Sequence, residues 1–285
     1  MDEADAWSAY WAQMGNAGTC LPGAPRAVSD ALATLWSNFA EDLPAGARVL
    51  DLATGTGAVP RVLTDANATL QVTGIDFAEL PAAPHKAIRL VGRTAMSALP
   101  FADGSFGAVT SQFGIEYADD DKAIAETARV TQPSGRLLFV IHHDSSPVLA
   151  QNRRRLKAIR ACRESDVAAM VRAEGADREA IKERLLPIAR DFRDQSVVGE
   201  IGAALDATRD LAGAEREDDI DRIERGMDRE ITTLAALDRA AKDEKSIDRF
   251  AGALASDFAC EKPAPLHAND GAKPIAWLIS GQRKG

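Results

Sequence analysis

The residues of this chain that could do chemistry begin with an acid and two glycines at the end of an apolar run. Val49–Gly57 reads V-L-D-L-A-T-G-T-G, so Asp51 lies in the run, and Gly55 and Gly57 follow it. Such a run is typical of a buried parallel strand, and glycines permit a sharp turn and the close approach of a ligand. Ala58–Ala66 then has helical apolar spacing. Strand, glycine loop and helix form the unit that binds nucleotide-like ligands in doubly wound folds, although a glycine pair alone also fits a tight turn.

The composition of this loop limits the class of ligand. No Lys-Ser/Thr pair follows the glycines, which excludes a phosphate-binding P-loop. Pro60 stands where a dinucleotide site would need its third glycine. Asp51 would repel a pyrophosphate and attract an ammonium group. The sequence therefore favours a nucleoside that carries a cation over a dinucleotide.

A second acid follows at a spacing that supports this interpretation. Gln71–Asp76 (Q-V-T-G-I-D) is a short apolar strand that ends in Asp76, about twenty residues after the glycine loop. This is the spacing at which an acidic side chain binds ribose hydroxyls in doubly wound nucleotide sites.

Four motifs, taken in order, resemble those of the class I S-adenosylmethionine-dependent methyltransferases. V-L-D-L-A-T-G-T-G is similar to their first motif, and V-T-G-I-D-F to their second strand with its acidic end. L-P-F-A-D-G-S-F-G-A-V-T-S is similar to the fourth strand and its lead-in, and A-R-V-T-Q-P-S-G-R-L-L-F-V to the helix, turn and fifth strand. The resemblance implies an α/β fold: a doubly wound, Rossmann-like, seven-stranded sheet with N-terminal helices and a large helical insertion before the closing hairpin.

The resemblance also implies S-adenosyl-L-methionine as cofactor and methyl transfer to O, N or C of a small-molecule acceptor. It places Asp51 and the glycine loop at the methionine end, Asp76 at the ribose and Phe77 beside the adenine. N-terminal aromatic residues would close over the site, where an aromatic face stabilises a sulfonium. The full set of expected cofactor-binding residues is Asp51, Ala53, Thr54, Gly55, Gly57, Asp76, Phe77, Ala95, Met96, Ser111, Gln112, Tyr10 and Trp11.

Two positions depart from the family pattern. Ala95 stands where the family often has an Asp that binds the adenine amino group, so that contact falls to backbone groups at Ala95–Met96 or to a hydroxyl of Thr94 or Ser97. The frequent S-F-D has also become S-F-G, ending at Gly107. These departures keep open an alternative function, a cofactor-binding protein or a non-methylating enzyme on the same fold.

Three residues are candidates for contact with the acceptor: Tyr117, His142 and His143. Glu116 and Tyr117 either face the acceptor or begin the next helix. His142 and His143 end the fifth expected strand, where neighbouring side chains point to opposite faces, so at most one should face the pocket. That histidine would act as a base if the acceptor loses a proton, or it is simply structural. We predict no metal site, because only Asp144 offers a third ligand.

Composition restricts the partners and the compartment. The formal net charge of the 285-residue chain is -9, which disfavours nucleic acid as a partner. Cys20, Cys162 and Cys260 show neither metal-ligand spacing nor a pairing pattern, which fits a reducing cytoplasm. Residues 1–10 do not resemble a signal peptide, and no apolar run is long enough to cross a bilayer. We therefore expect a cytoplasmic protein with no membrane partner.

The chain is expected to contain four segments. Residues 1–46 form a helical cap, 47–143 the cofactor-binding core, 144–245 a helical insertion, and 246–285 the last helix and closing hairpin. The insertion has dense mixed charge, which predicts solvated, salt-bridged helices. It would serve as a lid over the acceptor, as a homodimer interface, or as both. Strands are expected at Arg48–Leu52, Gln71–Ile75, Ala87–Val91, Gly107–Ser111 and Arg136–His142, with the hairpin at Asp257–Leu266 and Pro274–Ser280.

Overall fold

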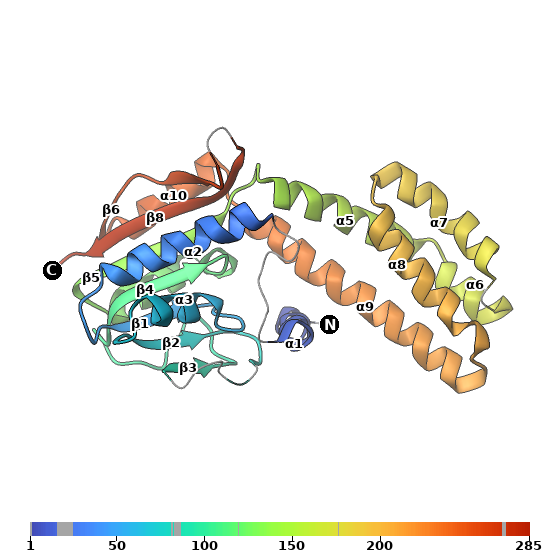
Figure 1. Cartoon of the computed structure of the whole chain (residues 1–285), viewed down its shortest axis with the longest axis horizontal. Helices are drawn as coiled ribbons and strands as arrows, with labels where there is room; N and C mark the ends of the chain where they lie inside the picture. Colours follow the sequence, from blue (N-terminus) through green and yellow to red (C-terminus); the bar gives the residue numbers. More distant parts are fainter. Residues whose placement is uncertain are drawn as a thin grey trace. The chain divides into compact units, whose positions relative to one another are not determined.

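The computed structural model describes residues 2–15, 25–80, 82, 87–118, 120–175, 177–269 and 272–285. The chain divides into two compact units, shown together in Figure 1. We call Trp7–Leu149 with Arg239–Gly285 the sheet unit, and Met1–Ala6 with Ala150–Asp238 the helical unit. Within the described residues, no helix combines the length and the apolar character that crossing a membrane requires.

The sheet unit is built on a mixed sheet of eight strands in the order β3-β2-β1-β4-β5-β8-β6, with β7 also paired to β8. Strands β1 to β5 are parallel, and β8 runs antiparallel to β5, β6 and β7. The order of the strands reverses between β1 and β4, which is where doubly wound folds bind ligands. The strands are β1 (Arg48–Leu52), β2 (Gln71–Ile75), β3 (Ile88–Val91), β4 (Phe106–Gln112), β5 (Thr131–His142), β6 (Phe258–Cys260), β7 (Ala264–His267) and β8 (Pro274–Arg283).

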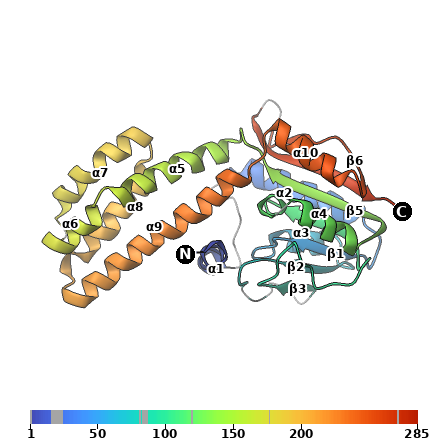
Figure 2. The same ribbon diagram turned by 180° about the vertical axis from the view of Figure 1, so that it is seen from behind.

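Helices cover both faces of this sheet (Figures 1 and 2). Alternate residues of each strand point to opposite faces, so Val49 of β1 packs with α2 and α3 whereas Leu50 packs with α4 and α10. The apolar stripe of α2 (Arg26–Glu41) and of α3 (Ala58–Ala66) thus closes one core. The stripes of α4 (Asp120–Val130) and α10 (Glu244–Leu254) close the other.

The helical unit has its own apolar core and a surface of ion pairs. The core forms between Ile159, Val171, Leu185, Ile201 and Ile220, among others. Asp177 and Asp194 cap α7 and α8 by accepting hydrogen bonds from backbone N–H groups. The helices are α5 (Pro147–Glu164), α6 (Val167–Glu174), α7 (Arg178–Phe192), α8 (Gln195–Asp206) and α9 (Gly213–Ala240), with a 3-10 turn at Ala207–Asp210.

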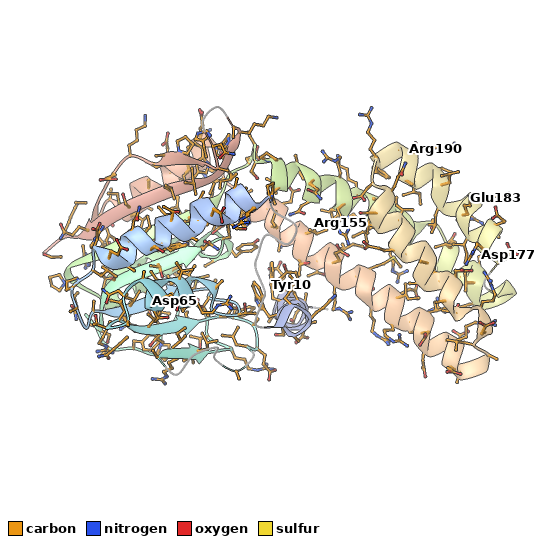
Figure 3. The ribbon with its side chains drawn as sticks, in the orientation of Figure 1. Tyr10, Asp65, Arg155, Asp177, Glu183 and Arg190 are labelled. Atoms are coloured by element: carbon orange, nitrogen blue, oxygen red, sulfur yellow. The ribbon has the colours of Figure 1, made fainter. Side chains whose placement is uncertain are left out.

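Ion pairs between α5 and α9 explain the mixed charge of this region. Arg155, labelled in Figure 3, pairs with Glu230, and Arg163 bonds Glu224 at 2.8 Å. Arg172 of α6 joins Asp221 and Glu224 at 2.5 Å each. The charges therefore stabilise contacts between helices of one unit, as the sequence pattern predicts.

The expected elements and the observed ones differ most at the closing hairpin and at the start of β5. The hairpin strand expected at Asp257–Leu266 is interrupted at residues 261–263, where Pro263 has no N–H to donate, so the sheet has eight strands rather than seven. Strand β5 begins at Thr131 instead of Arg136, with Ser134 at a φ of 61°. The expected N-terminal helices are observed as α1 (Glu3–Met14) and α2, and residues 16–24 between them lie outside the described residues.

Candidate cofactor and catalytic site

The carboxyl ends of β1 and β4 lie side by side, because Leu52 pairs with Ser111. Immediately beyond them, Ala53 and Phe113 adopt left-handed backbone conformations with φ of 51° and 57°. Residues other than glycine rarely do so, and the strain tends to gather at functional sites. Phe113 is held there by the hydrogen bond from its N–H to the carbonyl of Val140, 2.7 Å long. The strand order and the backbone thus both indicate a site at this edge.

The glycine loop is covered by helix α1. Gly55 has a φ of 52°, and a Cβ built on it would lie 2.7 Å from Cζ2 of Trp11. The indole of Trp11 is buried and therefore rests directly on the loop. Gly57 has a φ of 81° and precedes α3. Trp11 of the N-terminal helix therefore lies over the glycine loop, where aromatic residues are expected. A role of Trp11 in cofactor binding stays a prediction.

Asp76 binds the glycine loop through its own carboxylate. Its Oδ2 accepts a hydrogen bond from the N–H of Gly55 at 2.8 Å, and Oδ1 accepts one from Ala78 at 2.9 Å. The backbone of Phe77 also hydrogen-bonds this carboxylate. Because a carboxylate has about four acceptor positions, it can still accept a ribose hydroxyl. Burial raises the pKa of Asp76 above its usual value, against the opposing effect of these backbone bonds.

Asp51 is a second buried carboxyl beside the first. It is 1% exposed, and its Oδ1 accepts a hydrogen bond from Thr110 Oγ1 at 2.7 Å. The pKa of Asp51 is raised to about 7, mainly by burial and to a smaller extent by the charge of Asp76, against the lowering effect of hydrogen bonds to side chains such as Thr110. A ligand that brings positive charge would offset both effects. The donor set therefore fits the ammonium and sulfonium groups of S-adenosylmethionine.

The residues expected to bind adenine, Phe77 and Ala95–Met96, could hold a planar ligand. Phe77 is 55% exposed, although it directly follows the buried Asp76. The N–H of Thr94 donates to the carbonyl of Asp76 at 2.8 Å, which holds the segment containing Ala95 and Met96 beside this strand end. Both residues are half-buried. An exposed aromatic ring next to a half-buried loop offers adenine a stacking surface.

Two residues expected to border the cofactor are already engaged at the end of β4. Ser111 Oγ donates to the carbonyl of Leu52 and accepts from the N–H of Ile115, both at 3.0 Å. Gln112 Oε1 accepts from Trp36 Nε1 at 2.6 Å. These hydrogen bonds hold the turn after β4, and contact of Ser111 and Gln112 with the cofactor stays a prediction.

An aromatic cluster lies next to this turn. Trp7 stacks near Trp11 with ring centroids 6.1 Å apart, and it meets Tyr117 edge-on at 5.7 Å. Tyr10, labelled on α1 in Figure 3, packs edge-on against both tryptophans. The two expected aromatic residues of α1 and the expected Tyr117 thus share one cluster.

The two histidines at the end of β5 face different partners. His142 is buried, and its Nδ1 lies 2.7 Å from Glu116 Oε1. His143 stacks on Trp277 with centroids 4.3 Å apart, and its Nδ1 accepts a hydrogen bond from the N–H of Ser145. Burial lowers the pKa of His143. No group of three metal-ligating side chains occurs among the described residues.

Glu116 is a polar residue whose partner the sequence does not reveal. It stands between Ile115 and Tyr117 in a 3-10 turn, η2 (Ile115–Tyr117), and is buried. A lone acid within an apolar stretch after a strand was the available signal. Its pairing with His142, 26 residues later, depends on the adjacency of β4 and β5.

Comparison with known proteins agrees with this reading of the fold. Residues 50–139 match the family model described as a methyltransferase domain. A demethylmenaquinone methyltransferase of Thermus thermophilus is 43% identical over 117 residues, which is 37% of this chain and 53% of the relative. A ubiquinone/menaquinone biosynthesis C-methyltransferase of Citrifermentans bemidjiense is 38% identical over 128 residues, 40% of this chain and 54% of that one.

The chain thus spans about half the length of the curated relatives it matches. Among solved structures, an S-adenosylmethionine-dependent methyltransferase from Mesorhizobium loti is 19% identical, with a TM-score of 0.48 over 92% of this chain and 100% of that one. The matched residues include the end of β1, the glycine loop, β2 and β4. Over residues 50–139, the chain is therefore similar to the methyltransferase domain that this family model describes.

Proposed function

We propose that this protein transfers a methyl group from S-adenosylmethionine to a small-molecule acceptor by in-line displacement. The observation that supports this most directly is the pair of buried carboxyls, Asp51 and Asp76, at the point where the strand order reverses. Neither forms an ion pair with a described residue. Two acids in this setting select a ligand with positive charge.

Each part of the cofactor has matching residues. Asp51, Ala53, Thr54 and the two loop glycines would hold the methionine end, and Asp76 the ribose hydroxyls. Phe77 and the backbone of Ala95–Met96 would hold the adenine. The cofactor supplies a methyl group that its sulfonium has already activated, so the protein mainly aligns the reactants and excludes water. The aromatic cluster of α1 and η2 is suited to the second task.

The class of acceptor and the setting are also proposals. The curated relatives are named for demethylmenaquinone or for quinone biosynthesis, which makes a small organic ring compound the first acceptor to test. The net charge of -9 supports the absence of a nucleic-acid partner. A cytoplasmic location is supported by the free thiols of Cys162 and Cys260, whereas Cys20 lies outside the described residues. A homodimer is the remaining proposal.

The proposed activity is tested with methyl-deuterated S-adenosylmethionine and a panel of hydroxylated ring compounds. We expect the label on an acceptor and an equal amount of S-adenosylhomocysteine, measured by mass spectrometry. Tight binding of the cofactor without any product across the panel would instead favour the alternative of a cofactor-binding or non-methylating protein.

Replacing Asp76 by Ala should weaken the binding of S-adenosylmethionine by about 1.5–3 kcal/mol, the scale for hydrogen bonds to a charged group. The substitution removes the acceptors for ribose and also releases the N–H of Gly55. Calorimetry measures the dissociation constant, and circular dichroism checks the fold. An unchanged dissociation constant would mean that Asp76 is not the ribose ligand.

Removing Ala150–Asp238 and joining the ends with a short glycine linker should leave cofactor binding intact. The two ends already meet in the sheet unit, because the N–H of Asp144 donates to Lys242 and that of Lys242 donates to His142, at 3.0 and 2.9 Å. Both cores of the sheet are also complete without the helical unit. Calorimetry with S-adenosylmethionine is the measurement, and a folded variant that no longer binds it would contradict the prediction.

The same variant separates the two roles proposed for the helical insertion. If the insertion serves as a lid, turnover is lost while cofactor affinity survives. If it serves only as a dimer element, light scattering shows a monomer that still methylates the acceptor.

A further inference from the structure

A buried pair of titratable side chains joins the ends of β4 and β5. One oxygen of Glu116, Oε1, accepts a hydrogen bond from the backbone N–H of His142 at 2.8 Å and lies 2.7 Å from Nδ1 of the same residue. Both side chains are buried. Because the two residues stand on η2 and on a central strand, their mutual geometry is fixed by the sheet.

The outer atoms of this pair lack partners. Both Glu116 Oε2 and His142 Nε2 are buried without a hydrogen bond. A buried polar atom without a hydrogen-bond partner costs its full desolvation free energy. If the pair served only to join η2 to β5, these two unpartnered atoms would not be needed. Nδ1 faces a carboxylate oxygen, so it acts as the donor of this contact. In the tautomer with that donor, Nε2 holds a lone pair that can accept a proton.

The surroundings of Nε2 are aromatic. The Phe113 ring lies 4.4 Å from the His142 ring, centroid to centroid, and Tyr117 meets it edge-on at 6.1 Å. Trp7 of α1 packs edge-on against Tyr117 in turn. The chain has only two tyrosines and four tryptophans, and both tyrosines and two tryptophans gather here. Such a site suits a flat, largely apolar ligand with one polar hydrogen.

From these contacts we propose that His142 is the general base of the reaction, that Glu116 positions it, and that the acceptor is an aromatic hydroxyl compound. The inference rests on the proposed function. Because Nε2 is buried and Tyr117 packs against the ring, access of the acceptor to Nε2 requires this side chain to shift.

The proposed reaction moves one proton and one methyl group. The O–H bond of the acceptor breaks and its proton bonds to Nε2, while the methyl group passes from sulfur to oxygen and the S–CH3 electron pair stays on sulfur. The positive charge of the sulfonium thus moves to the imidazole ring, beside the Glu116 carboxylate that stabilises it. Where an ortho ring carbon takes the methyl group instead, its C–H proton is lost to water and Nε2 returns the first proton to the oxygen.

The test uses 4-nitrophenol, whose anion is yellow, with the full chain saturated by S-adenosylhomocysteine so that no turnover occurs. At a pH where the free probe is mostly protonated, the bound probe should show the anion spectrum. His142→Asn keeps a donor toward Glu116 but removes Nε2, and should lower the ratio of ionised to protonated probe about tenfold, which corresponds to one pKa unit. Glu116 and Tyr117 are the titratable groups against the ring in the described structure. Tyr117→Phe is therefore tested as well, and an anion spectrum that is lost in Tyr117→Phe but kept in His142→Asn overturns the assignment of His142 as the base.

Glu116→Gln distinguishes a positioning role from a structural one. Its amide oxygen can still accept from the N–H of His142, so a structural clamp would leave the probe spectrum unchanged. A positioning carboxylate predicts a loss similar to that of His142→Asn. His267→Gln is the matched control, because His267 is an exposed histidine on β7 and should not affect the spectrum.

Calorimetry with S-adenosylhomocysteine separates the two levels of the proposal. Unchanged affinity in each variant shows an intact fold and site, whereas no binding to the wild type contradicts the proposed function itself. Where S-adenosylhomocysteine binding is intact, three results contradict the assignment of His142 as the base: the probe fails to bind, it stays protonated when bound, or it ionises to the same extent in His142→Asn as in the wild type. If a variant does not fold, nitrogen NMR of the wild type decides: Nε2 of His142 must lack a proton without the probe and gain one with it.

Discussion

Replacing Asp51 by Asn is expected to stabilise the protein at about pH 8 and to abolish the binding of S-adenosylmethionine. Above its pKa of about 7, Asp51 is a buried charge next to Asp76. The neutral amide removes that charge and can still accept the hydrogen bond from Thr110. The same charge is what would attract the ammonium group of the cofactor, so affinity should fall by about 100-fold or more.

The pH dependence of the difference in stability between Asp51→Asn and the wild type shows whether the buried charge of Asp51 causes it. The pKa of Asp51 is raised in the folded state from 3.8, so the folded protein binds the proton more tightly than the unfolded chain. The contribution of Asp51 to stability is therefore complete below about pH 4, declines as the pH rises to about 7, and is constant above that. Asp51→Asn should match the wild type at the acid end and exceed it by up to about 4 kcal/mol at the alkaline end.

Urea unfolding of both proteins across this range measures the difference in free energy of unfolding. A difference that does not change with pH would show that Asp51 is not a buried carboxyl of this kind. Retained cofactor affinity in Asp51→Asn would remove this residue from the binding site.

Replacing Gly55 by Val should abolish cofactor binding. The φ of 52° is strained for any L side chain, and the new Cβ would lie 2.7 Å from the Trp11 ring. The two methyl groups would then displace Trp11 or fill the space above the loop that the methionine end needs. Together the strain and the overlap amount to about 2–5 kcal/mol. Calorimetry and thermal unfolding measure the two consequences.

Gly46→Val is the matched control for this prediction. Gly46 has a φ of 75°, but a Cβ there would meet nothing within 4 Å. The control therefore carries the backbone strain without the overlap, and it should lose some stability while its cofactor affinity remains. Equal loss of binding in both variants would assign the effect to general destabilisation instead of to the loop.

The elements near the glycine loop could be predicted because their signals are local. Arg48–Leu52, Gln71–Ile75 and Ala58–Ala66 are observed with the expected bounds, since apolar runs and a glycine turn specify them within a few residues. The eighth strand could not be predicted, because the interruption at Pro263 has the same composition as an ordinary turn in a longer strand. The early start of β5 depends on pairing of Thr131 with Phe106, a contact between distant residues.

In the candidate site, too, the positions of residues along the chain could be predicted, whereas contacts between distant residues could not. The resemblance brings Asp51, Asp76, Phe77 and the glycines to one edge of the sheet, and the structure places them there. It could not reveal that Asp76 binds the N–H of Gly55, or that Ser111 is occupied by Leu52 and Ile115. Those bonds, like the pairing of Glu116 with His142, join residues that only tertiary structure brings together.

The central claim is that the edge containing Asp51, Gly55 and Asp76 binds a cationic nucleoside, and one calorimetric titration tests it. S-adenosylmethionine is titrated into the wild-type protein near pH 7 in buffers with different ionisation enthalpies. We predict one site per chain and a release of protons on binding, because a cationic ligand lowers the raised pKa of Asp51. Binding without proton release, or no binding at all, would contradict the account.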